Sequence, residues 1–539
     1  WRKARRVYSL ASRLPGTNRL GFQPSMALSV GLEKEGLRVT PNGYLSMTDH
    51  PSALGASLTH PCITTDFSES LLELISPPFE NSLKALNFIN EAEAFVHRHL
   101  DDELIWSASM PCPIENEDDI RIAEYGPSHP GMQKMIYRRG LAHRYGKQMQ
   151  VIAGVHFNFS FSNELWIWLQ KASSSSMGNT TAFIAERTMS AVRNAQRHDW
   201  LLLFLFGASP ATSRSFSGAN GRLIPFDKHT LYLPYATSLR MGDMGYTNSP
   251  LINREVVINH NSLTGYIDSL RSVINTPYLA YEQFDGLDGS EQQLSNTLLQ
   301  TENEYYSTVR PKQVTQPGES LLNALQTRGI SYVELRSIDI NPFVPSGIEP
   351  AQLHFLELFM HHCLFTESLN IDNQEMETIR YNRNETAYRG RDPSLKLIHQ
   401  QEMITLYHWA SQLFDEMQPL AERLDQVHHT DHYLQALSHY RERLSQPHLT
   451  PSAQIIETMQ EAEESFSSFA LRRSQLHHQH HVALKLSDER IAFFQAVARQ
   501  SYRQKYILEH CKKCQVDKNS FYKEGHGTYR IQTLRCACN

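Results

Sequence analysis

The alternating pattern of residues 154–162, GVHFNFSFS, limits the possible fold more than any other stretch of this sequence. Apolar residues occupy every second position from Val155 to Phe161, and His156 and Asn158 stand between them. Because successive side chains of a β-strand point to opposite faces of a sheet, this pattern predicts a strand with one apolar and one polar face. His156 and Asn158 then share the polar face.

Two other strand-like stretches place charged residues two positions apart. SVGLEKEGLRV contains Glu33 and Glu35, and ISYVELRSIDI contains Glu334 and Arg336. In a strand such residues share a face, and two carboxylates about 6.7 Å apart repel by about 2.5 kcal/mol at an effective dielectric constant of about 20. A bound divalent cation would turn this repulsion into attraction. A solvated sheet face with Lys or Arg opposite would also relieve it, and the glutamate pair alone favours this simpler arrangement.

Together, the strand-like segments carry six candidate metal ligands, namely Glu33, Glu35, Asp66, Glu73, His156 and Glu334. Oxygen-dominated sets of this kind suit Mg²⁺ or Mn²⁺. Asp66 and Glu73 are seven residues apart, so we expect them to converge only if their segment is helical or contains a bulge. Taken singly, His156 could be a hydrogen-bonded core histidine and Arg336 half of a salt bridge. The sequence has no Walker or GxGxxG loop, so metal and arginine would have to hold any nucleotide.

Helical periodicity and loop composition describe much of the remaining chain. Residues 82–103 predict an amphipathic helix, residues 182–206 a helix and buried apolar chain, and residues 350–500 a largely helical region. The Asn-Gly pair in TPNGYLSM is typical of a hairpin. Residues 208–250 predict a polar loop too long for a passive connector. The HHQHH run at 477–481 could bind adventitious metal, but we expect it to be a solvated loop.

The composition is ordinary for a soluble globular protein, with 40% hydrophobic and 20% charged residues among 539. The net charge of −6 gives no support to a nucleic-acid partner. The most apolar stretch, residues 200–211, is shorter than the roughly 18 residues of a membrane span, so we expect no membrane partner. Seven cysteines, mostly scattered or crowded at the C-terminus, do not form a typical secreted disulfide pattern. We therefore expect a cytoplasmic protein.

Six motifs in order resemble those of proteobacterial glutamate–cysteine ligases, from about residue 29 to about 400. They are GLEKEGLRV, TTDFSESLLELISP, IYRRGL…RYG…Q…GVHFNFS, LFGASPA, YLPYATSLRMGDMGYTN and YVELRSIDINPFVPSG. The resemblance implies an α+β fold related to glutamine synthetase, in which a curved, mostly antiparallel sheet carries the active site and helices pack outside. It implies the first step of glutathione synthesis, in which the γ-carboxylate of L-glutamate attacks ATP and the amine of L-cysteine displaces phosphate from the resulting γ-glutamyl phosphate.

The resemblance also implies a role for each matching residue. The six acid and histidine positions would bind two or three Mg²⁺, with Mn²⁺ as a substitute, and ATP would be the co-substrate. Arg336 and Arg138 would face the transferring phosphoryl group, and Arg240 a substrate carboxylate or the acyl phosphate. The acceptor amino acid would contact a set of mostly aromatic and polar residues, namely Tyr137, Tyr246, Tyr306, Phe67, Leu141, Gln150 and Asn158. A related ligase with another acceptor amine and a non-catalytic metal-binding scaffold remain alternatives. We expect a monomer.

We divide the chain into a basic N-terminal extension (1–28), a catalytic glutamine synthetase-like core (29–350), a helical region packed on the core (351–483) and a divergent cysteine-containing tail (484–539). The extension could be a transit peptide, although a non-native start is favoured. In the tail, the spacing of Cys511, Cys514, Cys536 and Cys538 could hold a structural Zn²⁺. An accidental tail without zinc is favoured.

Overall fold

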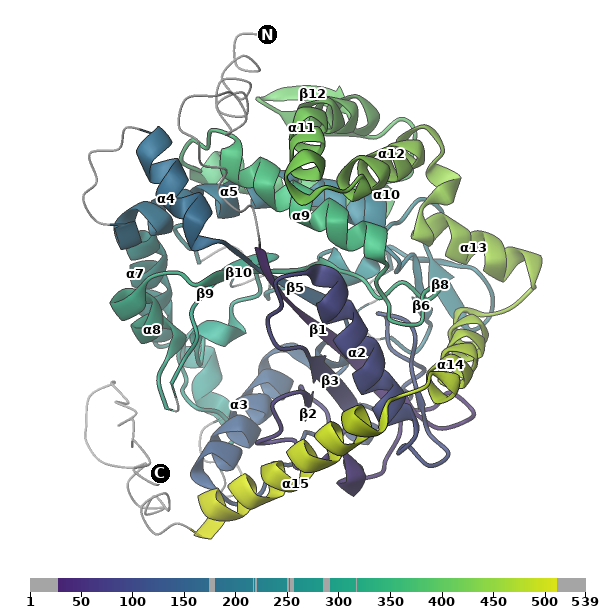
Figure 1. The fold of residues 1–539 in the computed structure, drawn as a ribbon. Helices are drawn as coiled ribbons and strands as arrows, with labels where there is room; N and C mark the ends of the chain where they lie inside the picture. Colours follow the sequence, from purple (N-terminus) through teal and green to yellow (C-terminus); the bar gives the residue numbers. More distant parts are fainter. Residues whose placement is uncertain are drawn as a thin grey trace.

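The computed structural model describes residues 28–173, 180–216, 218, 221–249, 252, 256–284, 291–316 and 318–510. Its main sheet is antiparallel, with strand order β2–β3–β1–β5–β10–β9 and with β4 paired to β1 off this path. The strands are β1 (Leu28–Val39), β2 (Ile63–Thr65), β3 (Leu71–Ile75), β4 (Leu104–Ile105), β5 (Val155–Phe161), β9 (Val309–Lys312) and β10 (Tyr332–Ile338). The expected α+β fold with a mostly antiparallel sheet is confirmed (Figure 1).

The predicted alternation of β5 decides which face of the sheet is covered. Leu32 of β1 pairs with Phe157, and Glu33 pairs with His156, so each face continues from one strand to the next. The apolar face is buried under helices, and the ring of Phe159 meets the His361 ring of α9 (Pro350–Phe365) at 6.0 Å. The hydrophobic effect therefore fixes the register, because a shift by one residue would expose this face.

Helices account for most of the rest of the chain. Besides α9 they are α2 (Ser82–His97), α3 (His129–Tyr145), α4 (Asn163–Ala172), α5 (Thr180–Phe206), α7 (Leu263–Ile274), α8 (Leu321–Arg328), α10 (Asn373–Arg389), α11 (Leu406–His428), α12 (His432–Ser445), α13 (Pro451–Glu461), α14 (Phe466–Ala483) and α15 (Asp488–His510). α2 packs against β1, and α5 packs against β9 and β10. None of the helices in the described ranges has the length and apolar character needed to cross a membrane.

Several local predictions are confirmed with changed boundaries. The helix expected at 82–103 ends at His97. Beyond it the chain turns toward β4, and Asp101 takes a positive φ of 49° in this turn. Gly43 forms the expected turn with a φ of 81°, but only one bridge, between Val39 and Leu45, continues it as a hairpin.

The loop expected at 208–250 contains short elements of its own. They are β6 (Ala211–Ser213), β7 (Ile224–Pro225), β8 (Thr230–Tyr232) and the 3-10 turn η4 (Leu239–Met241). β6, β8 and β7 pair in a small sheet. A second small sheet pairs β11 (Lys396–His399) with β12 (Glu402–Thr405).

The prediction of a solvated loop at residues 477–481 is wrong. These residues lie in α14, which packs against α2, and the side chains of His477 and His481 are buried. Their spacing of four residues puts both on the helix face that meets α2. Farther along, α15 packs the Phe494 ring against Phe95. The four tail cysteines (Cys511, Cys514, Cys536 and Cys538) and residues 1–27 lie outside the described residues.

Candidate active site

The strand register brings distant polar residues to one face of the sheet. In an antiparallel pair, directly opposed residues share a face, with Cβ atoms about 4.5–5.5 Å apart. Three such pairs cross four neighbouring strands, namely Glu73–Glu35, Glu33–His156 and Asn158–Glu334. Residues from β3, β1, β5 and β10 therefore form one continuous polar surface.

Glu33 lies at the centre of this surface. Its Oε2 is 2.8 Å from Nδ1 of His156, and its Oε1 accepts a hydrogen bond of 2.8 Å from Nδ2 of Asn158. One ligand atom from each of Glu33, Glu73 and His156 can be chosen so that all three atoms lie within 4.8 Å of one another. This spacing allows the three side chains to share one metal ion.

At the other end of the surface, the Glu334 carboxylate lies between two basic side chains. Its Oε1 accepts a hydrogen bond of 3.0 Å from Nη1 of Arg336, and its Oε2 lies 3.5 Å from the ammonium of Lys312. His156 links the two ends, because its Nδ1 lies 3.8 Å from Oε1 of Glu334. Thus a buried carboxylate is held between two side-chain cations beside the acidic cluster.

The meeting of Asp66 and Glu73 has a different cause from the one expected. Neither a helix nor a bulge joins them: β2 and β3 form a hairpin in which Thr64 pairs with Glu73 and Thr65 with Leu72. Asp66 lies two residues beyond Thr64, so it returns to the face of Glu73 after the chain reverses. The expectation based on a continuous segment was wrong, because counting along one strand does not apply across a turn.

The electrostatics of the acidic side chains divide the surface in two. Burial raises the pKa of Glu73 well above its ordinary value, and the charges of Glu33 and Asp66 raise it further. Burial likewise raises the pKa of Glu35. For Glu334, burial acts in the same direction, but the charges of Lys312 and Arg336 hold its pKa below the ordinary value. Around Glu73, burial and the mutual repulsion of the carboxylates therefore outweigh the attraction of the nearby cations, and a bound metal ion would add positive charge there.

The donor chemistry fits a hard divalent ion at this acidic part. Four carboxylates from the predicted set, those of Glu33, Glu35, Asp66 and Glu73, gather there with the imidazole of His156, a combination suited to Mg²⁺ or Mn²⁺. The backbone N–H of Gly154 donates a hydrogen bond of 2.7 Å to Oε2 of Glu35, which fixes that carboxylate. Such outer contacts orient metal ligands.

The two other predicted arginines lie on different sides of the cluster. Arg240 is 1% exposed, and its Nη2 donates a hydrogen bond of 2.8 Å to the backbone carbonyl of Arg336. Its charge also acts on Glu35. Arg138 of α3 instead donates to the backbone carbonyl of Asp66 and lies over the Tyr125 ring.

The predicted tyrosines gather next to Arg336. Tyr246 and Tyr306 line one cavity with Arg336, and their ring centroids are 4.6 Å apart. Gln150 donates a hydrogen bond of 3.0 Å from Nε2 to the Tyr306 hydroxyl. Tyr137 is near enough for its charge to act on the pKa of Tyr306.

Two predicted apolar residues lie deeper. Leu141 is one helical turn after Tyr137 in α3 and is 5% exposed. Phe67 lies in the turn between β2 and β3, and its ring is buried in the main hydrophobic core. Neither lines the cavity that Tyr246 and Tyr306 share with Arg336.

The sequence did not lead us to predict three cations near the site, namely Arg310, Lys312 and Arg383. Lys312 ends β9, a four-residue strand with a central proline that gives little alternation signal. Arg383 of α10 lines the cavity with Arg336, but no catalytic or substrate-binding residue was predicted beyond Arg336. In the sheet, Arg310 pairs with Glu334 and Lys312 with Tyr332. The two basic residues two apart in VRPK were the available sequence signal.

Comparison with known proteins identifies the family. A family model described as "Glutamate-cysteine ligase" matches residues 23–386. The chain is 41% identical to glutamate–cysteine ligase of Alcanivorax borkumensis, covering 87% of this chain and 90% of that protein. It is 44% identical to the enzyme of the same name from Azotobacter vinelandii, covering 89% and 91% of the two chains.

A solved structure supports the same assignment. The structure of glutamate–cysteine ligase from Francisella tularensis in complex with AMP matches with a TM-score of 0.84 and 33% identity, covering 90% of this chain and 96% of that one. A bifunctional glutathione synthetase from Pasteurella multocida, at 23% identity and a TM-score of 0.70, shares the fold. With its acidic sheet face, its order of motifs and these matches, the chain belongs to the glutamate–cysteine ligase family.

Proposed function

We propose that this protein joins the γ-carboxylate of L-glutamate to the amine of L-cysteine with consumption of ATP. The observation that carries this proposal is the continuous polar face in which the cluster of Glu33, Glu73 and His156 adjoins the Glu334–Arg336 pair. A carboxylate attacking a triphosphate brings two anions together, so catalysis needs fixed positive charge. Family membership and the AMP-bound structural relative support the reaction and the nucleotide.

The acidic face would hold two or three Mg²⁺, or Mn²⁺ in their place. The proposed ligands are the six predicted residues, Glu33, Glu35, Asp66, Glu73, His156 and Glu334. When bound, these ions would neutralise and orient the phosphate oxygens. The chain's own contribution is to keep several carboxylates together in a buried setting, at a repulsive cost that the cations offset.

Three arginines would orient the reactants. Arg336 can present a guanidinium to the transferring phosphoryl group, because Glu334 holds one of its nitrogens at 3.0 Å. We assign Arg240 to a substrate carboxylate or the acyl phosphate, and Arg138 to the phosphoryl side near Asp66. The cavity beside Arg336, lined by Tyr246 and Tyr306, would receive the acceptor amino acid.

The assay is ADP release with L-glutamate, ATP and Mg²⁺, comparing L-cysteine, 2-aminobutyrate, glycine and ammonia as acceptors. We expect the highest kcat/KM with L-cysteine. A clear preference for ammonia would overturn the assignment of the acceptor. The absence of turnover with every acceptor would instead favour a metal-binding scaffold.

Two substitutions test the acidic face in the same assay. Glu33→Gln and Glu334→Gln each remove a charge while keeping the shape of the side chain, so we expect amide formation to be abolished with the fold retained. Glu442→Gln, at an exposed position of α12, is the matched control and should behave as the wild type. Normal turnover in Glu33→Gln and Glu334→Gln would refute the site.

We further propose that the protein works as a monomer in the cytoplasm. The three described cysteines, Cys62, Cys112 and Cys363, are all free and buried, which is compatible with a reducing compartment. Sedimentation velocity of the full chain would test the monomer, and fractionation of producing cells would test the location.

A further inference from the structure

We propose a second metal site, for a transition-metal ion of the zinc class, built from Glu93, His97 and His481. It lies on the helix-covered face of β1, opposite the acidic face with Glu33 and Glu35. One ligand atom from each of the three residues can be chosen so that all three lie within 4.8 Å of one another. The site is independent of the proposed ligase activity.

Two packed helices create the cluster. Glu93 and His97 are four residues apart on α2, and His477 and His481 are four apart on α14, so each pair occupies one face of its helix. α14 packs against α2, which brings His481 Nε2 to 3.3 Å from Glu93 Oε2. Zn–N and Zn–O bonds of about 2.0–2.1 Å in a tetrahedron imply donor separations of about 3.4 Å, close to this distance.

The candidate ligand atoms are buried, and not all of them have a hydrogen-bond partner. The three side chains of the proposed site are at most 4% exposed. Among the described residues, Glu93 Oε2 has no hydrogen-bond partner, and Nε2 of His481, 3.3 Å from it, also lies 3.3 Å from the carbonyl oxygen of Pro345. The rings of His97 and His481 are stacked with centroids 5.0 Å apart. A metal ion would supply partners for polar atoms whose burial is otherwise costly.

The chemistry of these side chains selects the class of metal. Two imidazoles and one carboxylate suit Zn²⁺ or a neighbouring transition metal, whereas Mg²⁺ prefers oxygen ligands and retained waters. Nδ1 of His478 lies 3.1 Å from Nδ1 of His97, a hydrogen bond that would orient the His97 ring.

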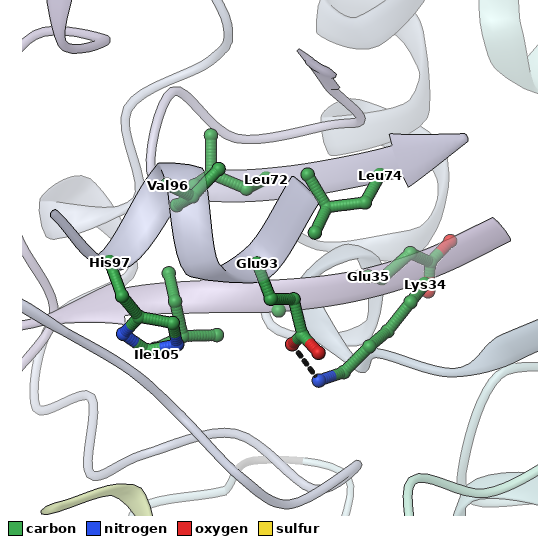
Figure 2. A pocket seen from close by; sticks show the side chains of 9 residues that line it. Lys34, Glu35, Leu72, Leu74, Glu93, Val96, His97 and Ile105 are labelled. Carbon is green, nitrogen blue, oxygen red and sulfur yellow. Dashed lines mark hydrogen bonds and ion pairs between the residues drawn. The ribbon is translucent and has the colours of Figure 1, made fainter. Parts of the chain in front are cut away.

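Lys34 is the main competitor of such an ion. Its ammonium forms an ion pair with Glu93 and donates a hydrogen bond of 3.2 Å to the Pro345 carbonyl, and Figure 2 shows it beside the Glu93 carboxylate, with His97 also on α2. An incoming dication must displace this ammonium or share Glu93 with it. Removal of the lysine charge should therefore strengthen metal binding.

The test is to strip the full chain of bound metal with a chelator, add zinc back and measure the bound zinc by elemental analysis. Mg²⁺ is present in excess to occupy the acidic face. We expect His481→Gln and His97→Gln each to lose one equivalent of zinc relative to the wild type. His480→Gln is the matched control, because His480 is the exposed neighbour of His481 in the same run. Any zinc held by the tail cysteines stays in all variants.

Three further measurements keep the result decisive. Zinc should raise the Tm of the wild type and of His480→Gln but not that of His481→Gln. Lys34→Met should bind zinc at least tenfold more tightly than the wild type. If a histidine variant fails to fold, Co²⁺ added to the wild type should still give the visible bands of tetrahedral nitrogen and oxygen ligation. Equal zinc content in all folded variants, or an absence of those bands, would overturn the proposal.

Discussion

Gly154→Ala tests whether the buried position of Arg240 matters for the reaction. A Cβ at residue 154 would lie 2.5 Å from Cζ of Arg240, against the 3.4 Å at which ordinary contacts begin. Arg240 is 1% exposed and bonded to the backbone of Arg336, so it must shift by about 1 Å within a packed interior. A misplacement of this size costs about 10²-fold, or about 2.7 kcal/mol in transition-state free energy.

The assay is ADP release as a function of L-glutamate concentration, together with thermal unfolding. We expect kcat/KM of Gly154→Ala to fall about a hundredfold, with an overpacking cost of roughly 1–3 kcal/mol in stability. Gly31→Ala is the control for the stability cost, because its Cβ would lie 3.7 Å from Asn158 Cβ, an ordinary contact on the neighbouring strand. Wild-type kcat/KM in Gly154→Ala would refute the assigned role of Arg240.

Three other substitutions probe the catalytic surface, the packing and the pH dependence. Arg336→Lys should lower kcat/KM for ADP release more than a hundredfold at an unchanged Tm, because an ammonium cannot reproduce the fork of a guanidinium; a loss below tenfold would contradict this. Gly36→Ala should cost roughly 1–3 kcal/mol in urea unfolding, since its Cβ would lie 2.6 Å from Ile105 Cγ2. Combined with Ile105→Ala the cost should shrink, and strict additivity would disprove the clash. Burial lowers the pKa of His260 to about 4, so its contribution to stability is present above the unfolded value of about 6.5 and is lost as pH falls toward 4. His260→Gln should reduce the stability lost between these pH values by about 3 kcal/mol, and an unchanged pH profile would count against the neutral buried ring.

The pattern of apolar and polar residues along the chain was enough to predict helices and strands whose buried face shows in their own sequence. The buried residues of β5 alternate along its sequence, and those of α5 include its apolar run, so both elements were predicted correctly. Element ends were less predictable, as with α2, which stops at His97. Ends depend on where the chain must turn to reach the next element, and periodicity alone does not contain this information.

The sequence by itself determined which residues of each strand share a face, and hence that Glu33 with Glu35, and His156 with Asn158, could act together. The tertiary structure decided which strands adjoin, because register and strand order are set by burying the apolar face of the whole sheet. The β2–β3 hairpin returns Asp66 to Glu73, and β9 brings Lys312 to Glu334. The packing of α14 on α2 likewise turns an apparent loop of histidines into a buried cluster, since contacts between segments so far apart have no trace in local spacing.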